Sequence, residues 1–336
     1  MIISRTPFRI SFFGGGTDLR TFYSKTNGEV LSTAIDKYLY VVVKRKLGIV
    51  EYKYRINWSV VEFTNQINKI KNPIARECLK YFKIDYPIEI TTFADIPANT
   101  GLGSSSAFAV GLVNALFALE GKFASKYEIA SIAAKIEIDI LQRKIGKQDH
   151  FASTYGNLNN FVFKKNEEVI INPIVASLKT INKLENNLMM FYTGQQRNSE
   201  TVLKKQSNVN HNQFENLIRL KKLVNTSKKI LLNKKFDIKK FGNLVHQNWE
   251  IKKKINRFTS NKSIDKFYNI GIKAGAYGGK LLGAGNGGFI LFVCSKHNHY
   301  KIIKKLKKLK KIDIKLDYSG TRITYIDKEL KKKNFF

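Results

Sequence analysis

The sequence has few cysteines, few prolines and no long apolar run. Its two cysteines, Cys78 and Cys294, form no CxxC pair and show no Cys/His metal spacing, so we expect neither a disulfide nor a bound metal there. Only five prolines occur, and no Pro/Ser-rich linker divides the chain. No stretch of about 18 apolar residues occurs, which predicts no membrane span, and the first ten residues lack the apolar core of a signal peptide. These absences predict a cytoplasmic protein.

Acidic residues are also scarce, with 26 Asp and Glu against 59 Lys and Arg, a net charge of +33 over 336 residues. Such a balance favours an anionic partner such as nucleic acid, membrane lipid or a phosphorylated substrate. The charge is spread along the chain, however, and abundant lysine and asparagine also follow from AT-rich coding. Nucleic-acid-binding proteins gather their charge in a patch, often beside aromatic residues. We therefore expect no nucleic-acid partner, and keep a basic nucleic-acid-binding protein as the alternative from another class.

The densest basic run, residues 301–311, is the best support for that alternative. Ile302, Ile303, Leu306 and Leu309 give the run an apolar face. This spacing predicts a core-packed helix with a solvated basic side. A helix resting on anionic lipid is a further alternative.

Residues 101–107 (GLGSSSA) combine glycines and hydroxyls directly before a helix pattern over 107–120. Glycines let the main chain approach an anion, and hydroxyls add donors. A helix N-terminus presents unpaired N–H groups and a partial positive charge. The segment predicts a phosphate site, with a plain loop and a serine N-cap as the alternative. The Walker pattern GxxxxGK[ST] is absent, which disfavours a P-loop fold.

Two acids lie on either side of a glycine break. Glu137 falls on a predicted helix over 126–143, and Asp149 falls in the loop after Gly146. Phosphoryl transfer needs oxygen ligands for Mg²⁺ and a group that orients or deprotonates the attacking hydroxyl. Two acids so placed can supply both, although Glu137 also fits a solvated helix position beside Lys135.

Two further glycine segments lie far apart in the chain. Arg9 precedes the run of residues 14–18 (GGGTD), and a strand, a glycine loop and an acid in this order can position a polyol. A hairpin turn with an Asx cap is the alternative. Residues 278–288 hold six glycines, more than one turn requires, which indicates close approach to a ligand or to another loop.

In this order the segments resemble the motifs of the GHMP kinases, a family that includes galactokinase, homoserine kinase, mevalonate kinase and phosphomevalonate kinase. Residues 7–18 (PFRISFFGGGTD) resemble the N-terminal motif, residues 101–107 the central motif, and residues 281–289 (LLGAGNGGF) the C-terminal motif. The resemblance spans most of the chain. It implies a kinase that uses ATP and Mg²⁺ as cofactors and a small sugar or sugar phosphate as its partner.

The resemblance also implies roles for single residues. The loop expected to wrap the ATP phosphates is Gly101, Leu102, Gly103, Ser104, Ser105 and Ser106. Ser105 and Glu137 take the places of the Mg²⁺ ligands, Asp149 that of the catalytic aspartate, and Arg9 that of the basic residue near the transferred phosphoryl group. The residues expected to contact the acceptor are Gly14, Gly15, Gly16, Thr17, Asp18 and Gly285.

Departures from the family pattern bear on the substrate. Galactokinases typically have Gly-Glu-His-Thr-Asp where this chain has residues 14–18 (GGGTD), so the site is expected to be roomier. That run, residues 146–150 (GKQDH) and residues 193–200 (TGQQRNSE) together resemble the bacterial heptose 7-phosphate kinases, which phosphorylate the anomeric hydroxyl. Arg197 is then a candidate contact to the substrate phosphate, and His150 replaces a common glutamine. A kinase for another sugar, such as fucose or galactose, stays open.

The fold that the resemblance implies is α+β with two domains. A ribosomal S5 domain 2-like unit is expected over residues 1–175 and a ferredoxin-like unit over residues 176–336. The apolar patterns agree with a mixed fold. They predict strands at 8–13, 38–43, 88–92, 184–193 and 289–293, and helices at 107–120, 126–143, 210–256 and 264–276. No pattern indicates the oligomeric state.

Overall fold

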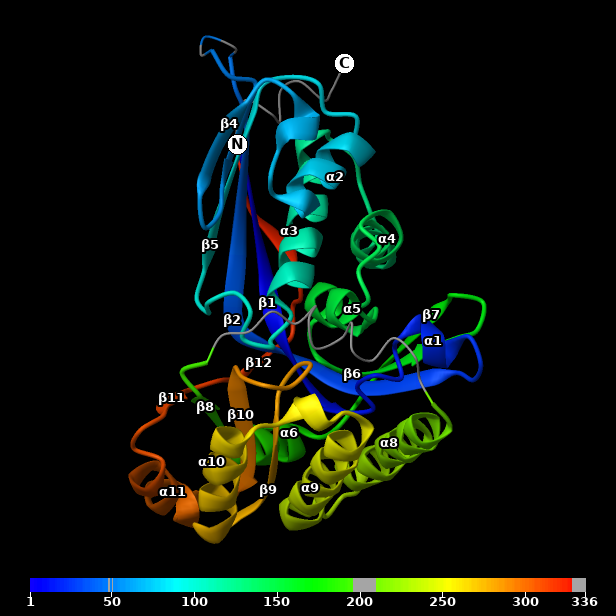
Figure 1. Cartoon of the computed structure of the whole chain (residues 1–336), viewed down its shortest axis with the longest axis vertical. Coiled ribbons are helices and arrows are strands. Elements are labelled where there is room, and N and C mark those ends of the chain that lie inside the picture. Colours follow the sequence, from blue (N-terminus) through cyan, green and yellow to red (C-terminus); the bar gives the residue numbers. More distant parts are fainter. Residues whose placement is uncertain (48, 50, 196–209, 328–336) are drawn as a thin grey trace.

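The computed structural model describes residues 1–47, 49, 51–195 and 210–327. Within these ranges the chain builds two β-sheets, which occupy opposite ends of the molecule with helices packed against each (Figure 1). No helix in these ranges is long and apolar enough to cross a membrane.

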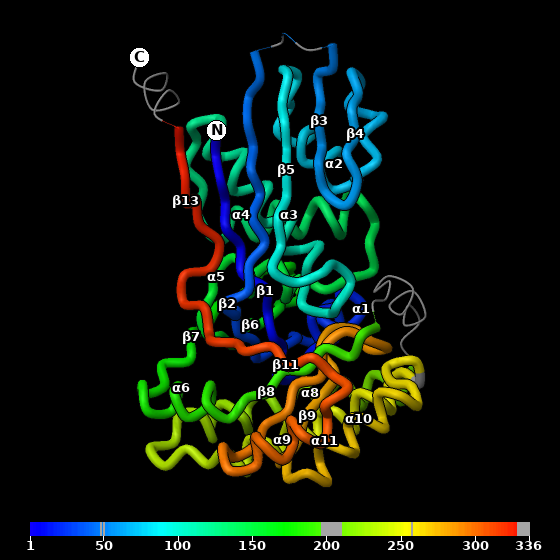
Figure 2. Tube along the Cα trace, turned by 90° about the vertical axis from the view of Figure 1, so that its left-hand side faces the viewer, coloured from blue at the N-terminus to red at the C-terminus, as the bar shows by residue number. Residues whose placement is uncertain are grey.

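The larger sheet has nine strands within the described ranges. They are β1 (Ile2–Phe13), β2 (Gly28–Arg45), β3 (Tyr54–Asn57), β4 (Val61–Thr64), β5 (Ile88–Ala94), β6 (Leu158–Phe163), β7 (Val169–Pro173), β12 (Leu316–Asp317) and β13 (Arg322–Ile326). The main order is β13-β1-β2-β5-β3-β4, which Figure 2 shows side by side. β2 is long enough to pair with β6 through its first part and with β5 through its last part. β2 therefore joins the part of the sheet that contains β6 and β7 to the part that contains β5, β3 and β4.

The helices of this unit follow start signals in the sequence. They are α1 (Arg20–Tyr23), α2 (Pro73–Tyr81), α3 (Ser104–Leu119), α4 (Lys126–Lys135) and α5 (Gln148–Tyr155). Asn72 caps α2 directly before Pro73, and Ser125 caps α4. α3 is buried along most of its length because it packs against β1 and β2. Gly111 permits this contact, since a Cβ there would lie 2.9 Å from Thr6 Oγ1.

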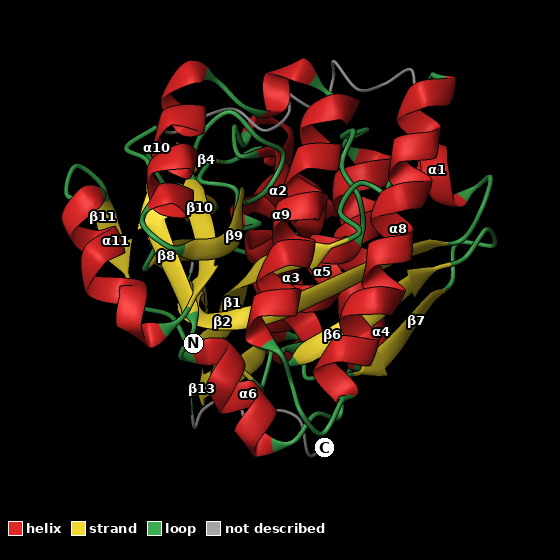
Figure 3. Cartoon of the chain, turned by 90° about the horizontal axis from the view of Figure 1, so that it is seen from below, coloured by secondary structure: helices red, strands yellow, loops and turns green. Residues whose placement is uncertain are grey.

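The smaller sheet is antiparallel throughout. Its strands are β8 (Leu188–Tyr192), β9 (Ala276–Leu281), β10 (Phe289–Cys294) and β11 (Lys310–Ile312). Its unit also contains α6 (Leu178–Glu185), α8 (His211–Leu232), α9 (Ile238–Ile255), α10 (Lys262–Lys273) and α11 (His299–Lys305). The spatial order β11-β8-β10-β9, with helices between β8 and β9 and α11 between β10 and β11, is the ferredoxin-like arrangement that was predicted. α8 and α9 lie side by side (Figure 3).

The two units share one apolar core. The rings of Phe12 and Phe13, at the end of β1, pack edge-on against Phe241 of α9, with centroids 5.6 and 5.3 Å apart. After β11 the chain returns to the larger sheet, where β12 pairs with β2 and β13 with β1. The last strands of the expected 176–336 domain thus complete the larger sheet. The boundary near residue 175, between β7 and α6, stays a prediction.

Most of the predicted elements are confirmed, and several need correction. The helix over 107–120 is α3, and the expected apolar face of the basic run is buried at Ile302, Leu306 and Leu309, whereas Ile303 is exposed. The helix predicted over this run is too long, because α11 ends at Lys305 and β11 begins at Lys310. The helix predicted over 126–143 is too long. α4 ends at Lys135, a π-helix covers Ile136–Ile140, and the left-handed φ of 53° at Gln142 ends the helical path.

Three further corrections concern strands and the position of one acid. The strand predicted from residue 184 begins only at Leu188, because α6 and its cap occupy the residues before it. Gly278 and Gly279, predicted in a loop, belong to β9. A Cβ at Gly278 would lie 2.0 Å from the Gly242 carbonyl oxygen, so the glycine lets β9 pack tightly on α9. Asp149, predicted in a loop, is in the first turn of α5.

Candidate active site

A cavity of about 960 Å³ is lined by residues of both units. The larger-sheet unit contributes the end of β1, the loop before α3, and the start of α5. The smaller-sheet unit contributes one side of α9, the end of β9 and the loop after it. The predicted motifs, far apart in the sequence, therefore meet at one place.

The start of α3 forms one wall of this cavity. Gly101 and Gly103 have φ of 83° and 80°, left-handed values that glycine adopts without strain, and Gly103 is the N-cap. No side chain caps the helix, so its first N–H groups, from Ser104 onward, are left to bind an anion. Gly101, Gly103 and the three serines line the cavity. Leu102 is buried instead, and its carbonyl accepts a hydrogen bond from the Arg9 N–H.

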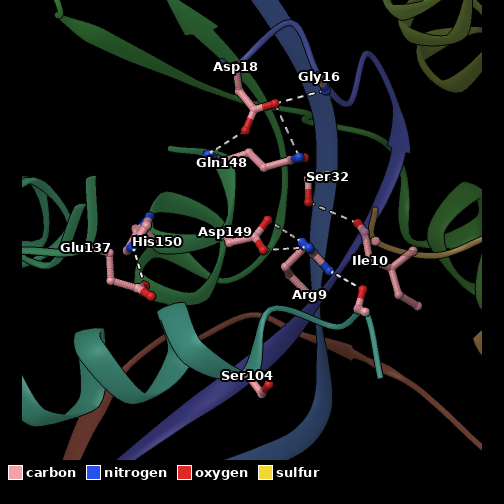
Figure 4. Close-up of polar contacts among 12 residues, drawn as sticks. Arg9, Ile10, Gly16, Asp18, Ser32, Ser104, Glu137, Gln148, Asp149 and His150 are labelled. Carbon is pink, nitrogen blue, oxygen red and sulfur yellow. Dashed lines mark hydrogen bonds and ion pairs between the residues drawn. The ribbon is translucent and has the colours of Figure 1, made fainter. Parts of the chain in front are cut away.

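Arg9 and Asp149 form a two-point ion pair beside this wall (Figure 4). Arg9 Nε donates to Asp149 Oδ1 at 2.6 Å, and Nη2 donates to Oδ2 at 2.5 Å. Arg9 Nη1 donates to the Gly101 carbonyl at 2.8 Å. Gly103 also lies next to the Asp149 carboxylate, because a Cβ added to this glycine would be 3.0 Å from Asp149 Oδ2. The structure thus connects the predicted basic residue, the predicted catalytic acid and the glycine–serine loop.

Glu137 lies in a separate buried network. Arg143 Nη1 donates to one carboxylate oxygen at 2.6 Å, and His150 Nε2 lies 2.9 Å from the other. Burial opposes ionisation of Glu137, but His150, Arg143 and a hydrogen bond from Ser105 hold the pKa of its carboxyl below its usual value. The contact with Ser105 brings together the two residues predicted to bind Mg²⁺. Glu137 itself is not among the described residues that line the cavity.

The N-terminal glycine segment divides into two parts. Gly15, Gly16 and Asp18 line the cavity. Gly14 and Thr17 hold the loop instead: a Cβ on Gly14 would lie 2.0 Å from the Glu29 carbonyl oxygen, and Thr17 Oγ1 contacts the Gly14 and Glu29 carbonyls, each at 2.8 Å. Only the first group is therefore placed to touch a ligand.

The Asp18 carboxylate is buried and is held by main-chain donors. The Gly16 N–H donates to it at 3.0 Å and the Gln148 N–H at 3.2 Å. Burial raises the pKa of Asp18, and the nearby charge of Asp149 raises it further, against these hydrogen bonds. Gly146 permits this arrangement, because a Cβ on it would lie 1.8 Å from Asp18 Oδ2.

The C-terminal glycine segment supports the wall formed by the start of α3. A Cβ on Gly288 would lie 2.0 Å from the Thr100 carbonyl oxygen, so this loop packs directly on the loop before α3. Gly285 packs against the main chain of Thr259 and is not among the described residues that line the cavity, which Gly283 and Ala284 do line. Its predicted contact with the acceptor stays a prediction. Arg197, the predicted phosphate contact, lies outside the described residues.

The cavity also has an apolar end that the sequence patterns did not reveal. Leu39, Trp58, Ile74, Ile96 and Phe108 line it. Trp58 Nε1 donates to Glu62 Oε1 at 2.7 Å, which fixes the indole ring at the rim. No motif surrounds Trp58, and only the strands β3 and β4 on either side of it indicate its position.

Three polar residues of the site were also missed or given no role. His150 and Arg143 hold Glu137, and Lys280 of β9 is buried at the cavity wall, donating to the Ser11 and Phe12 carbonyls at 2.8 and 2.9 Å. The sequence offered one signal for Lys280, its place directly before the C-terminal glycine motif. His150 was noticed only as a departure from a common glutamine.

Comparison with known proteins agrees with this geometry. The family model of the GHMP kinases N terminal domain matches residues 68–157, and that of the GHMP kinases C terminal matches residues 229–312. These matches cover the start of α3, Glu137, Asp149 and most of the smaller-sheet unit. The fold and the site define a small-molecule kinase, and the chain belongs to the GHMP kinase family. Within the family it is an ATP-dependent sugar kinase.

Individual relatives agree with this assignment. The chain is 29% identical over 318 residues to the D-glycero-alpha-D-manno-heptose 7-phosphate kinase of Campylobacter jejuni, covering 91% of this chain and 93% of the relative. It is 24% identical to the bifunctional fucokinase/GDP-fucose pyrophosphorylase of Arabidopsis thaliana, covering 92% of this chain and 31% of that protein. The crystal structure of a D-glycero-D-manno-heptose 1-phosphate kinase from Bacteriodes thetaiotaomicron shares the fold, with a TM-score of 0.79, 22% identity and coverage of 97% and 100%.

Proposed function

We propose that this sugar kinase transfers the γ-phosphoryl group of ATP to the anomeric hydroxyl of D-glycero-D-manno-heptose 7-phosphate. The product is the 1,7-bisphosphate, a precursor for nucleotide-activated heptose. The observation that carries the proposal is the Arg9–Asp149 pair beside the start of α3, with Gly15 and Gly16 opening the acceptor side of the cavity. The similarity to the Campylobacter jejuni heptose kinase supports this choice of sugar.

Asp149 is the group proposed to orient or deprotonate the sugar hydroxyl. Its carboxylate is partly exposed, with 20% of the side chain accessible, so a substrate oxygen can reach it. Arg9 fixes its orientation through two hydrogen bonds and simultaneously holds the Gly101 carbonyl. The reacting acid and the loop for the ATP phosphates therefore keep a constant spacing, which is what phosphoryl transfer requires.

The start of α3 is proposed to bind the ATP phosphates through its free N–H groups and the hydroxyls of Ser104, Ser105 and Ser106. Ser105 and Glu137 supply hard oxygen donors that suit Mg²⁺, and the ion would take the place of Arg143 or His150 at the Glu137 carboxylate. Among the described residues no three His, Cys, Asp or Glu side chains gather at one point, so phosphate and water oxygens are expected to complete the coordination. The ion would neutralise charge that develops on the transferred phosphoryl group.

The apolar end of the cavity is proposed to receive the adenine base. Trp58 offers a flat ring held by Glu62, and Leu39 and Ile96 provide apolar contacts. Base stacking on an aromatic ring is worth about 1–3 kcal/mol. ATP would then extend from this end to the Arg9–Asp149 pair, with its phosphates at the start of α3.

The acceptor is proposed to bind between Asp18 and the smaller-sheet unit. Asp18 can accept hydrogen bonds from sugar hydroxyls. Gly15 and Gly16 stand where galactokinases typically have larger side chains, which leaves room for a seven-carbon sugar. A fucose or galactose kinase is the second candidate within the family, and the similarity to the fucokinase of Arabidopsis thaliana favours fucose over galactose.

ATP consumption by purified protein with Mg²⁺ tests the proposal. The panel is heptose 7-phosphate, sedoheptulose 7-phosphate, galactose, fucose and mevalonate. We expect turnover with heptose 7-phosphate and new phosphate at C1. Turnover with galactose or fucose alone would refute the heptose assignment and keep the sugar kinase. Absence of ATP binding would count against the nucleotide site.

A further inference from the structure

The cations of the cavity differ in their partners. The Arg9 guanidinium is paired with Asp149, and the Arg143 guanidinium with Glu137. Lys280 is 2% exposed and lines the same cavity, yet it forms no ion pair with any carboxylate in the described ranges. Two of its three donors bind the Ser11 and Phe12 carbonyls. When Lys280 is an ammonium group, its third N–H donor therefore has no partner among the described residues.

An unpaired buried ammonium group is costly, and the surroundings increase the cost. Burial lowers the pKa of Lys280 well below its usual value, and the positive charges of Lys252 and Arg9 lower it further. A bound anion would reverse this effect. Lysine is a common phosphate ligand in proteins, acting as a point charge.

Three residues that line the cavity each have a buried polar atom with no hydrogen-bond partner among the described residues. The atoms are Ser11 Oγ, Gln148 Oε1 and Asn248 Oδ1. Asn248 is 1% exposed and lies on α9, one helical turn before Lys252, and Ser11 is the residue whose carbonyl Lys280 binds. Buried polar atoms without partners point to a missing ligand, and these are acceptors that fit sugar hydroxyls.

The contacts order these groups relative to the reaction centre. The Gly101 carbonyl accepts a hydrogen bond from Arg9, Arg9 binds Asp149, and β1 continues from Arg9 to Ser11, whose carbonyl accepts from Lys280. Lys280 and Asn248 belong to the smaller-sheet unit, whereas the loop proposed to bind the ATP phosphates belongs to the larger-sheet unit. A group bound at Lys280 is therefore assigned to the acceptor.

We propose that Lys280, Asn248 and Ser11 form a subsite for the phosphate-bearing end of the acceptor, so that the enzyme selects a phosphorylated sugar over the free sugar. Lys280 binds the phosphate, and Ser11 and Asn248 accept from hydroxyls next to it. Lys252, which contacts the Gly283 carbonyl, adds positive charge at the same wall. This inference rests on the proposed sugar-phosphate kinase function and names the residues that recognise the phosphate already present on the acceptor.

The test compares paired acceptors that differ only in the phosphate. The pairs are heptose 7-phosphate with free heptose, and mannose 6-phosphate with mannose. For each protein the ratio of kcat/KM within a pair is measured, or the ratio of affinities by calorimetry where turnover is absent. The variants are Lys280→Met and Asn248→Asp, which places a carboxylate on the α9 side of the same cavity. Lys273→Met, the same change at an exposed position of α10, is the matched control.

We expect the wild-type protein to prefer the phosphorylated member of a pair. Lys280→Met and Asn248→Asp should each reduce this preference about 10-fold to 100-fold, the range of a charge-assisted hydrogen bond, with the KM for ATP unchanged. Lys273→Met should keep the preference. If Lys280→Met does not fold, Asn248→Asp decides the question alone.

Several results would overturn the subsite. These are an unchanged preference in both variants, an equal loss with phosphorylated and free sugars, or a wild-type protein that prefers or binds only free sugars. An equal loss would mean that Lys280 only clamps the end of β1. The proposed function fails separately: if heptose 7-phosphate is inert but mannose 6-phosphate is preferred through Lys280, the heptose assignment falls and the subsite stands.

Discussion

Arg9 on β1 and Asp149 in the first turn of α5 are joined by two hydrogen bonds of 2.6 and 2.5 Å across 140 residues of sequence. The third contact of Arg9, to the Gly101 carbonyl, adds the loop before α3 to this pair. Three segments are therefore held by one guanidinium, whose planar shape suits a carboxylate with two acceptor oxygens. Predictions about the reaction begin from this pair.

Asp149→Asn should lower kcat by at least about 10²-fold to 10³-fold while the protein still folds. The amide cannot take the proton of the sugar hydroxyl and loses one acceptor for Arg9. Steady-state kinetics with ATP and the best acceptor of the panel measure the change. Asp85→Asn, at an exposed position, is the control, and near-wild-type turnover in Asp149→Asn would remove Asp149 from the mechanism.

Arg9→Lys keeps the charge but cannot hold Asp149 at two points and Gly101 at the same time. We expect kcat to fall about 10-fold to 100-fold and the KM for ATP to increase, because the loop before α3 loses its anchor. The conservative change Arg322→Lys, on the exposed strand β13, should alter neither value. A variant with an unchanged KM for ATP would contradict the anchoring role of Arg9.

Glu137→Gln should increase the Mg²⁺ concentration needed for half-maximal activity. The substitution keeps the size of the side chain but removes the charge that Mg²⁺ requires. It also leaves Arg143 without its carboxylate, so the free energy of unfolding should fall by about 1–3 kcal/mol. Glu128→Gln, at an exposed position of α4, is the control. An Mg²⁺ titration that matches the wild type would refute the assignment.

Gly15→Ala should fold normally, because a Cβ there would meet only Ser11 Oγ at 3.4 Å and Gln148 Nε2 at 3.8 Å. Gly15→Glu places in the cavity the side chain that galactokinases typically carry. We expect it to increase the KM for a seven-carbon sugar phosphate about 10-fold or more, since the carboxylate both fills space and repels phosphate. The KM for ATP serves as the internal reference. An unchanged acceptor KM would show that Gly15 does not face the acceptor.

The raised pKa of Asp18 has a consequence for stability. The folded state keeps a proton on Asp18 to higher pH than the unfolded state does. The stabilisation that this proton gives to the folded state is therefore complete below the unfolded pKa and is lost as the pH rises through the folded pKa. Asp18→Asn cannot titrate. The stability of this variant relative to the wild type should therefore increase as the pH rises above about 4, the pKa of an unfolded aspartate, as measured by urea unfolding. A pH-independent difference would contradict the raised pKa.

Local patterns predicted much of the fold. The continuous apolar run of 107–120 predicted α3, which is buried on most sides, and the alternation of residues 88–92 predicted β5. Both patterns follow directly from the spacing of apolar residues. The π-helix at Ile136–Ile140 was missed, because the apolar spacing over 126–143 does not distinguish it from an α-helix. The strand positions of Gly278 and Gly279 were missed because they depend on the packing of α9.

The sequence by itself determined the class of the protein, because three separate motifs resemble those of the GHMP kinases and occur in the same order along the chain. It also predicted Arg9, Asp149 and Asp18 as site residues, and all three line one cavity. Only the tertiary structure decided which of these residues touch the cavity, and it added Lys280, Asn248 and Trp58, whose surroundings come from distant elements. Burial, ion pairing and unpaired polar atoms are properties of contacts across the chain, so no local pattern encodes them.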